Sequence, residues 1–80
     1  MIAVMIKAAQ IRAGRSLVGL KQGDVAKSAG ISLTAYNNIE TGKSDPRVST
    51  LEAIQTALES AGIEFIPANG GGIGVRLREG

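Results

Sequence analysis

The chain of 80 residues has neither cysteine nor histidine, and Tyr36 and Phe65 are its only aromatic residues. The absence of cysteine excludes disulfides, thiol catalysis and thiolate metal sites, and the absence of histidine removes the commonest general base and metal ligand. We therefore expect no enzyme, no metal site and no cofactor. With so few aromatic residues, the core must be built from Ile, Leu, Val and Ala, which suits small helices packed closely together.

Neither sign of charge dominates, because nine basic residues face seven acidic ones and the net charge is +2. This balance is compatible with nucleic acid but is weaker than in many DNA-binding domains. A long apolar run is also absent: residues 1–6 are too short for a signal-peptide core or a membrane span. We expect one cytoplasmic domain over residues 1–80, with a thin stability margin that self-association would increase.

The spacing of apolar residues predicts four helices. The first is expected from Met5 to Leu17, with a buried stripe of Ile6, Ala9, Ala13 and Leu17. Gly14 costs roughly 1 kcal/mol there relative to alanine, so it indicates tertiary support or a close approach by another element. The fourth helix should start at Ser49 with a Ser49/Glu52 capping box and end at Gly62, burying Leu51, Ile54, Leu58 and Ala61.

Between them, the stretch from Gln22 to Ile39 has the pattern of two short helices joined by one sharp turn. The second helix is expected over Gln22–Ala29, and Gly30 supplies the turn. Ser32 is a good N-cap for a third helix, which is expected over Leu33–Thr41. This pattern is typical of a helix-turn-helix, in which one helix face is held outward.

The last residues alternate apolar and polar side chains, which predicts two short strands: Ile63 and Phe65 lie in the first, and Ile73, Val75 and Leu77 in the second. Asn69-Gly70 is a turn signal within a long, glycine-rich connection, so we expect a loose hairpin. An isolated two-stranded ribbon is marginal in water, so it must pack on the helices, pair with a second copy, or do both.

The region from Ile6 to Gly62 resembles the lambda-repressor-like, Cro and xenobiotic-response-element family of helix-turn-helix regulators. The resemblance rests on Ile11, Arg12, Arg15, Gly19, Leu20, Gln22, Val25, Ala26, Gly30, Ile31, Ser32, Ile39, Glu40, Gly42, Pro46, Leu51 and Ile54. It implies a mainly α fold, a compact four-helix domain over residues 6–62. A two-stranded β extension over residues 63–78 replaces the family's usual fifth helix.

The outward face of the third helix is predicted to carry Leu33, Thr34, Asn37 and Asn38, because Tyr36 and Ile39 face inward. Asparagine can pair with an adenine edge, threonine can hydrogen-bond a base or touch a thymine methyl, and leucine can contact that methyl. The alternative is an ordinary solvated helix face. Because Arg, Lys and Gln are missing from the set, we expect readout that is weak, A/T-biased or based on DNA shape.

The resemblance also implies which residues contact phosphates. Gln22 would do so from the N-terminus of the second helix, where unpaired N–H groups gather. The alternative is that Gln22 only caps that helix. The other candidates are Lys21, Thr41, Lys43, Ser44 and Arg47, each of which is otherwise a solvated surface residue. Arg15 and Glu40 are expected to form a partly buried structural ion pair, with Arg12 directed at solvent.

Two functions from different classes follow. The first is a homodimeric, sequence-specific DNA-binding transcriptional regulator on an inverted-repeat operator, a repressor or an activator, with the third helices about 34 Å apart. Its dimer surface would be the C-terminal strands, through Phe65, Ile66, Val75 and Leu77. The second is an antitoxin or anti-activator that uses the same fold to mask a regulator or toxin protein. Neither function involves a membrane.

Overall fold

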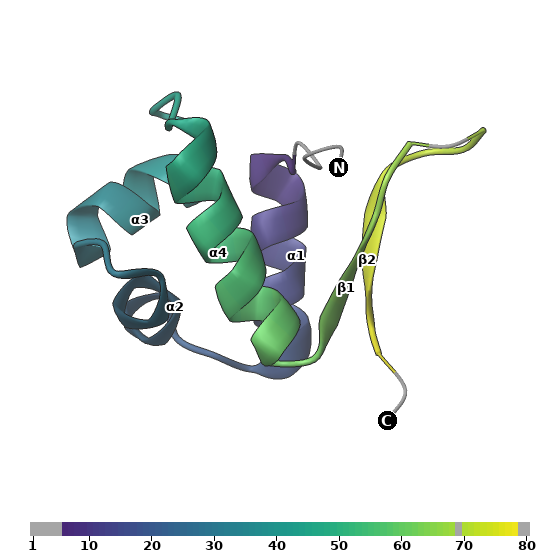
Figure 1. Cartoon of the computed structure of the whole chain (residues 1–80), viewed down its shortest axis with the longest axis horizontal. Helices are drawn as coiled ribbons and strands as arrows, with labels where there is room; N and C mark the ends of the chain where they lie inside the picture. Colours follow the sequence, from purple (N-terminus) through teal and green to yellow (C-terminus); the bar gives the residue numbers. More distant parts are fainter. Residues whose placement is uncertain (1–5, 69, 79–80) are drawn as a thin grey trace.

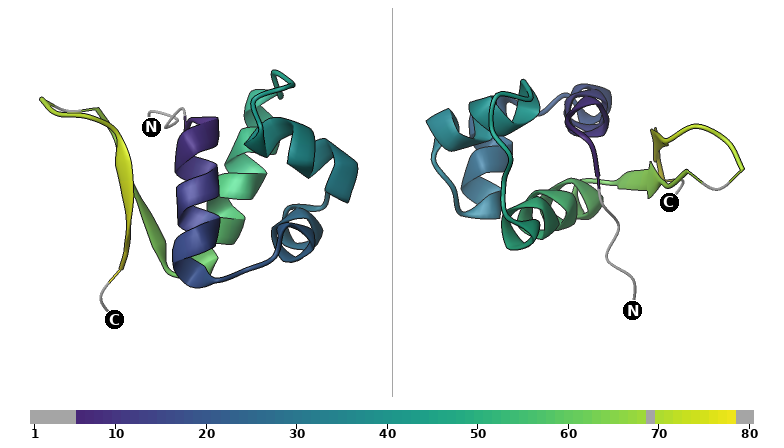
Figure 2. Two further views of the ribbon diagram at one scale, coloured as in Figure 1. Left: turned by 180° about the vertical axis from the view of Figure 1, so that it is seen from behind. Right: turned by 90° about the horizontal axis from the view of Figure 1, so that it is seen from above.

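The computed structural model describes residues 6–68 and 70–78, which form four helices followed by a two-stranded antiparallel sheet. The elements are α1 (Ala8–Val18), α2 (Gln22–Ala29), α3 (Leu33–Glu40), α4 (Val48–Ser60), β1 (Ile63–Ile66) and β2 (Gly74–Leu77). Helices α1 and α4 stand side by side in the middle of the molecule, with the α2–α3 pair on one side and the hairpin on the other (Figures 1 and 2). The mainly α fold class with a C-terminal β extension is confirmed.

Local sequence signals set the boundaries of the two helices in the helix-turn-helix. Gly30 follows α2 with a φ of 73°, in the left-handed region that glycine adopts without a steric penalty. The Ser32 hydroxyl then accepts a hydrogen bond of 3.0 Å from the Ala35 N–H, so it caps α3 as predicted. The bounds of α2 are those predicted, and α3 ends at Glu40, with Thr41 as its C-cap.

The predicted buried stripe of α1 is wrong in most of its members, since Ala9, Ala13 and Leu17 are exposed. The helix is rotated so that its buried residues are Gln10, Ile11 and Gly14. It begins at Ala8 rather than Met5, and Met5 lies outside the described residues. Ile6, just before the helix, is buried as expected.

Long-range contacts explain this rotation. The Gln10 side-chain amide donates to the carbonyl oxygens of Gly74, at 3.0 Å, and Ile66, at 3.4 Å, and so joins α1 to both strands. At Gly14, an added Cβ would lie 3.4 Å from Ile63 Cγ2 and 3.7 Å from Leu58 Cδ1. Gly14 therefore permits the close approach that the sequence indicated, and a polar amide takes a position that periodicity assigns to an apolar residue.

The predicted start of α4 is also wrong. The helix begins at Val48 after Arg47, whose backbone is extended and whose carbonyl accepts hydrogen bonds from Thr50 and Leu51 N–H at 3.0 and 3.1 Å. The N-cap is thus two residues earlier than a Ser49/Glu52 capping box would require. Ile54 and Leu58 are buried as predicted, Leu51 is partly buried, and Ala61 is exposed because it caps the C-terminus.

The hairpin packs on the helices, with β2 against α1 and β1 against both α1 and α4. Its register pairs Ile63 with Leu77 and Phe65 with Val75. Ile63 and Phe65 are buried in the same core as Tyr36, Ile54 and Leu58. The connection is long, as expected: Ile73 lies before β2 rather than in it, and Asn69 of the predicted turn lies outside the described residues. Within residues 6–68 and 70–78, no fifth helix follows α4.

Candidate nucleic-acid interface

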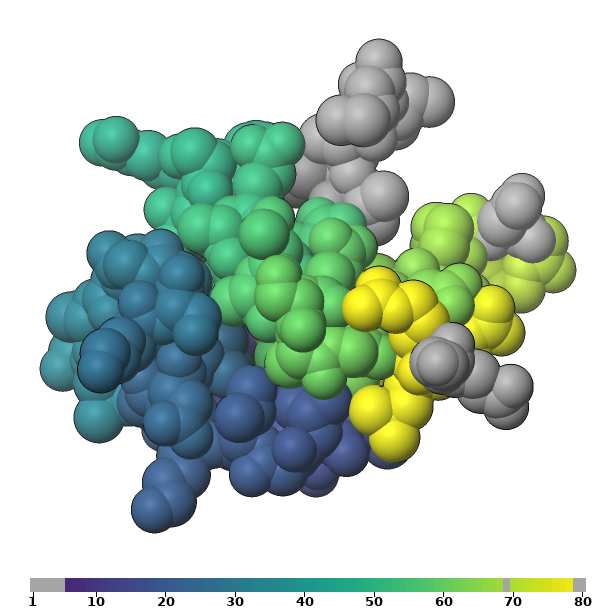
Figure 3. Space-filling view, turned by 60° about the horizontal axis from the view of Figure 1, so that its bottom comes forward, coloured from purple at the N-terminus to yellow at the C-terminus, as the bar shows by residue number. Residues whose placement is uncertain are grey.

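The third helix separates its residues into an inner and an outer face. Tyr36, Ile39 and Glu40 are buried. On the opposite side Leu33 and Thr34 are exposed, and Asn37 and Asn38 are half-buried. The structure thus places the four predicted base-contacting residues on one outward arc of α3. This end of the molecule lies opposite the hairpin, as the space-filling view shows (Figure 3).

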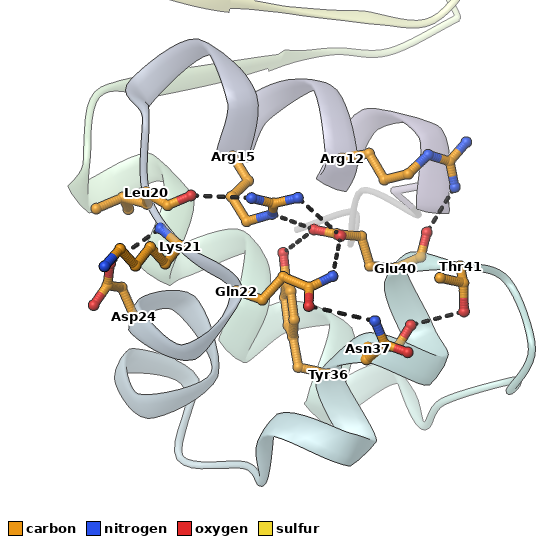
Figure 4. A network of polar contacts seen from close by, with 10 residues as sticks. All are labelled: Arg12, Arg15, Leu20, Lys21, Gln22, Asp24, Tyr36, Asn37, Glu40 and Thr41. Atoms are coloured by element: carbon orange, nitrogen blue, oxygen red, sulfur yellow. Dashed lines mark hydrogen bonds and ion pairs between the residues drawn. The ribbon is translucent and has the colours of Figure 1, made fainter.

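The Glu40 carboxylate is the centre of a hydrogen-bond network that joins α1, α2 and α3 (Figure 4). Arg15 donates to it twice, from Nε to Oε1 at 2.6 Å and from Nη2 to Oε2 at 3.1 Å. Gln22 Nε2 donates to Oε2 at 2.7 Å, and the Tyr36 hydroxyl donates to Oε1 at 2.7 Å. Glu40 is only 2% exposed, so these four bonds replace its contacts with water.

The network keeps Glu40 charged. Burial by itself would raise the pKa of Glu40, but hydrogen bonds from Arg15, Gln22 and Tyr36 outweigh it and hold the pKa below its ordinary value. The hydrogen bond to Glu40 likewise raises the pKa of Arg15. Burial, and then the hydrogen bond to Glu40, raise the pKa of Tyr36, which stays a neutral donor. The expected Arg15–Glu40 ion pair is present and is one part of this larger set.

Gln22 links this interior network to the outward face. Its Nε2 donates to Glu40, and its Oε1 accepts from Asn37 Nδ2 at 3.3 Å. Gln22 is not the cap of α2, because Lys21 is the N-cap residue and the Asp24 carboxylate, three residues later, accepts from the Lys21 N–H at 3.0 Å. Gln22 therefore fixes the N-terminus of α2 relative to the outward face of α3.

Arg12 makes a contact that the sequence reasoning missed. Instead of pointing only to solvent, its Nη1 donates to the Glu40 backbone oxygen at 2.6 Å, at the C-terminal end of α3. Its position three residues before Arg15 was the available signal, because residues three apart lie on the same side of a helix. A cation at this end also complements the partial negative charge of the helix terminus.

The remaining phosphate candidates border α3. The backbone N–H groups of Lys43 and Ser44 donate to the backbone oxygen of Asn38 at 2.8 and 3.2 Å, which holds the loop after α3 against that helix. The Thr41 hydroxyl donates to the backbone oxygen of Asn37 at 2.8 Å, so the hydroxyl proton is already used. Lys21 and Arg47 are exposed, directly before α2 and α4.

Comparison with known families agrees with this geometry. Residues 11–64 match the helix-turn-helix family model, which covers α1 from Ile11 onward, the other three helices and the start of β1. The chain is a member of the lambda-repressor/Cro-like helix-turn-helix family. This family consists of DNA-binding regulators that are typically not enzymes, so the chain is a DNA-binding helix-turn-helix regulator. No curated protein sequence matches it.

Two further observations describe this helix-turn-helix regulator. In the described part of the chain, no helix has both the length and the apolar character needed to cross a membrane. Of the four predicted dimer residues, Phe65 is 7% exposed and belongs to the core of its own chain, so it is a poor candidate for an intermolecular contact. Ile66 and Val75 are half-buried, and Leu77 is exposed.

Proposed function

We propose that this helix-turn-helix regulator is a repressor that binds an inverted-repeat operator as a homodimer, with one α3 in each of two major grooves. The observation that carries the proposal is the pair of hydrogen bonds at Gln22, which donates to Glu40 and accepts from Asn37. It couples a phosphate-binding position to a base-contacting position through a buried anchor. Such coupling is useful to a protein that must hold two contact points in fixed register on DNA.

Base readout is assigned to Thr34, Asn37 and Asn38, with Leu33 at the margin. The Glu40 network is made by Arg15, Gln22 and Tyr36, with Asn37 bonded to Gln22. The side chains of Thr34 and Asn38 are not part of it and are available to base edges. Asn38 suits a bidentate contact with adenine, and Thr34 suits a thymine methyl. Asn37 gives one amide hydrogen to Gln22 and keeps its oxygen as an acceptor. This chemistry supports an A/T-biased half-site.

Phosphate contacts are assigned to the residues on either side of this face. Gln22 presents the N-terminus of α2, an eight-residue helix whose first N–H groups and dipole favour an anion. Lys21, Lys43 and Arg47 add positive charge, and Ser44 adds a hydroxyl donor near the end of α3. Thr41 would have to give up its hydrogen bond to the Asn37 backbone oxygen before its hydroxyl could donate to a phosphate. Each phosphate neutralised steepens the salt dependence of binding by about 0.9 in the log–log slope.

The test measures binding to the DNA upstream of the chain's own gene at two salt concentrations. Asn38→Ala should weaken specific binding by about 1 to 3 kcal/mol and leave the salt slope unchanged. Lys43→Ala should weaken binding to all sequences and reduce the slope by about 1. Gln55→Ala, which removes an amide from α4 instead of α3, is the matched control and should bind like the wild type. Absence of sequence-preferring, salt-sensitive binding would refute the proposal.

A second candidate, masking of a regulator or toxin protein, is favoured by one observation. Leu33 is 53% exposed at the start of α3, where an apolar side chain suits a protein surface as well as a thymine methyl. Capture of one defined protein partner that is lost with Leu33→Asp but kept with Asn38→Ala would support this role. Gene neighbourhood provides a further test, because an adjacent toxin or activator gene supplies the partner to be mixed with the purified chain.

A further inference from the structure

The free edge of β2 and the exposed side of α1 form one continuous surface, which lies away from the outward face of α3. We propose that two copies of the chain join here, with their β2 strands paired antiparallel about a two-fold axis through Val75. The proposal rests on the homodimer of the proposed function and names its interface. Within the described residues the sheet has only two strands, so β2 has no partner on its outer side.

The register of the hairpin shows which backbone groups lie at this edge. The Arg78 N–H donates to the Gly62 oxygen at 2.7 Å, and the pairs Arg76–Glu64 and Gly74–Ile66 follow at intervals of two. Because residues of an antiparallel strand point their backbone groups to alternate sides, those of Val75 and Leu77 point outward. The free edge therefore presents backbone donors and acceptors at Ile73, Val75 and Leu77.

The strand sequence is self-complementary about Val75. A two-fold axis there places Val75 opposite itself and Ile73 opposite Leu77 of the second copy, so apolar side chains pair on one face. On the other face each Arg76 lies opposite a Gly74, which avoids the arginine pair that a centre at Arg76 would create. Arg76 meanwhile keeps its ion pair of 2.9 Å with Glu64 of its own chain.

Helix α1 provides a second contact on the same side of the sheet. A groove between α1 and β2 is lined by Ala9, Gln10, Ala13, Ile73, Gly74 and Val75. Ala9, Ala13 and Leu17 recur every four residues along the exposed side of α1, and they are the stripe that the sequence predicted to be buried. A two-fold axis perpendicular to the sheet brings α1 of the second copy to this stripe, and alanines allow two helices to approach closely.

The resulting dimer suits DNA binding. All four helices lie on one face of the hairpin (Figures 1 and 2). An axis perpendicular to the joined sheet therefore keeps both α2–α3 pairs on that same side. The two recognition helices then face one direction, as an inverted-repeat operator requires. Each strand edge is also removed from water, which protects it against pairing with other proteins.

Cysteine cross-linking tests the register, because the chain has no cysteine of its own. Directly opposed residues of a hydrogen-bonded antiparallel pair have Cα atoms about 5.5 Å apart, within the range of a disulfide. Under mild oxidation Val75→Cys should give a covalent dimer at least tenfold faster than Arg76→Cys, its neighbour, or Val48→Cys, which is exposed on α4. Equal rates for the three variants, or no cross-link at position 75, would overturn the proposal.

Charge substitution tests the same interface without cysteine chemistry. Ile73→Lys/Leu77→Lys and Ile73→Glu/Leu77→Glu each place like charges opposite each other, and both positions are about half exposed, so the monomer should keep its fold. We expect each variant to dissociate with at least a tenfold higher dimer Kd by sedimentation equilibrium, and an equimolar mixture to form heterodimers in native mass spectrometry. Val48→Lys is the matched control and should dimerise like the wild type.

Ala13→Glu, on α1, tests the helix contact independently of the strand and should also raise the dimer Kd at least tenfold. Wild-type dimerisation by all of these variants would refute the interface. That result is distinct from a failure of the proposed function: a chain that dimerises differently still binds its operator, whereas a chain that binds no DNA can still cross-link at position 75.

Discussion

Removal of the Glu40 carboxylate should cost the chain a large share of its stability. In Glu40→Ala, the Arg15 guanidinium, the Gln22 amide and the buried Tyr36 hydroxyl lose their acceptor together. Breaking a buried ion pair from one side costs about 3 to 5 kcal/mol. The Arg15 side chain is 25% exposed, so water can solvate part of the freed charge, and we expect the lower end, about 3 kcal/mol.

This loss is large for a chain of 80 residues, whose total unfolding free energy should be about 4 to 12 kcal/mol. With a urea m-value of about 1 kcal/mol/M, the unfolding midpoint should fall by about 3 M. The assay is urea unfolding at pH 7, followed by circular dichroism at 222 nm. Glu64→Ala is the control, because it removes an exposed ion pair with Arg76 and should leave the midpoint unchanged. A shift below about 1 M for Glu40→Ala, at the same m-value, would refute the reasoning.

Two further predictions concern acid and packing. Because the pKa of Glu40 is lowered by folding, its stabilising effect is fully present above the ordinary glutamate pKa of about 4.3 and is lost as pH falls through the lowered value. The stability gap between wild type and Glu40→Gln, measured by urea unfolding from pH 7 to pH 3, should therefore shrink on acidification, and a constant gap would contradict this. Gly14→Ala should stabilise the chain by about 0.5 to 1 kcal/mol, since its Cβ makes ordinary contact with Ile63, whereas Gly14→Leu should destabilise it by about 1 to 3 kcal/mol. Thermal unfolding of both variants checks this pair, and a stable Gly14→Leu would contradict the close packing.

Local signals were sufficient for the helix-turn-helix. The bounds of α2 and the cap of α3 follow from Gly30 and Ser32, whose effects act within one turn of backbone. The outward face of α3 was also predictable, because two inward residues, Tyr36 and Ile39, fix the orientation of a helix this short. The family resemblance added the Arg15–Glu40 pair, which no local pattern indicates.

Contacts between distant residues account for what the sequence did not predict. The orientation of α1 depends on Gln10, whose amide reaches carbonyls of both strands, 56 and 64 residues further along the chain. Hydrophobic periodicity gives no weight to a polar residue such as Gln10. It therefore predicted that the alanine stripe would be the buried side of α1. The role of Gln22 was missed for the same reason, since its partners Asn37 and Glu40 lie on a different helix.

Under the proposed function, the composition of α3 limits how the chain can acquire a new operator. Of its eight residues, Tyr36, Ile39 and Glu40 are buried, Ala35 is half-buried, and Asn37 is bonded to Gln22. Substitutions should therefore destabilise the fold least at Leu33, Thr34 and Asn38. A change in the DNA sequence that is bound has to arise from substitutions at these three positions. Transplanting a whole recognition helix from a relative would succeed only if the donor helix carries the same tyrosine and glutamate. Divergence of DNA specificity in such chains should consequently proceed by single outward substitutions, with the anchor beneath them unchanged.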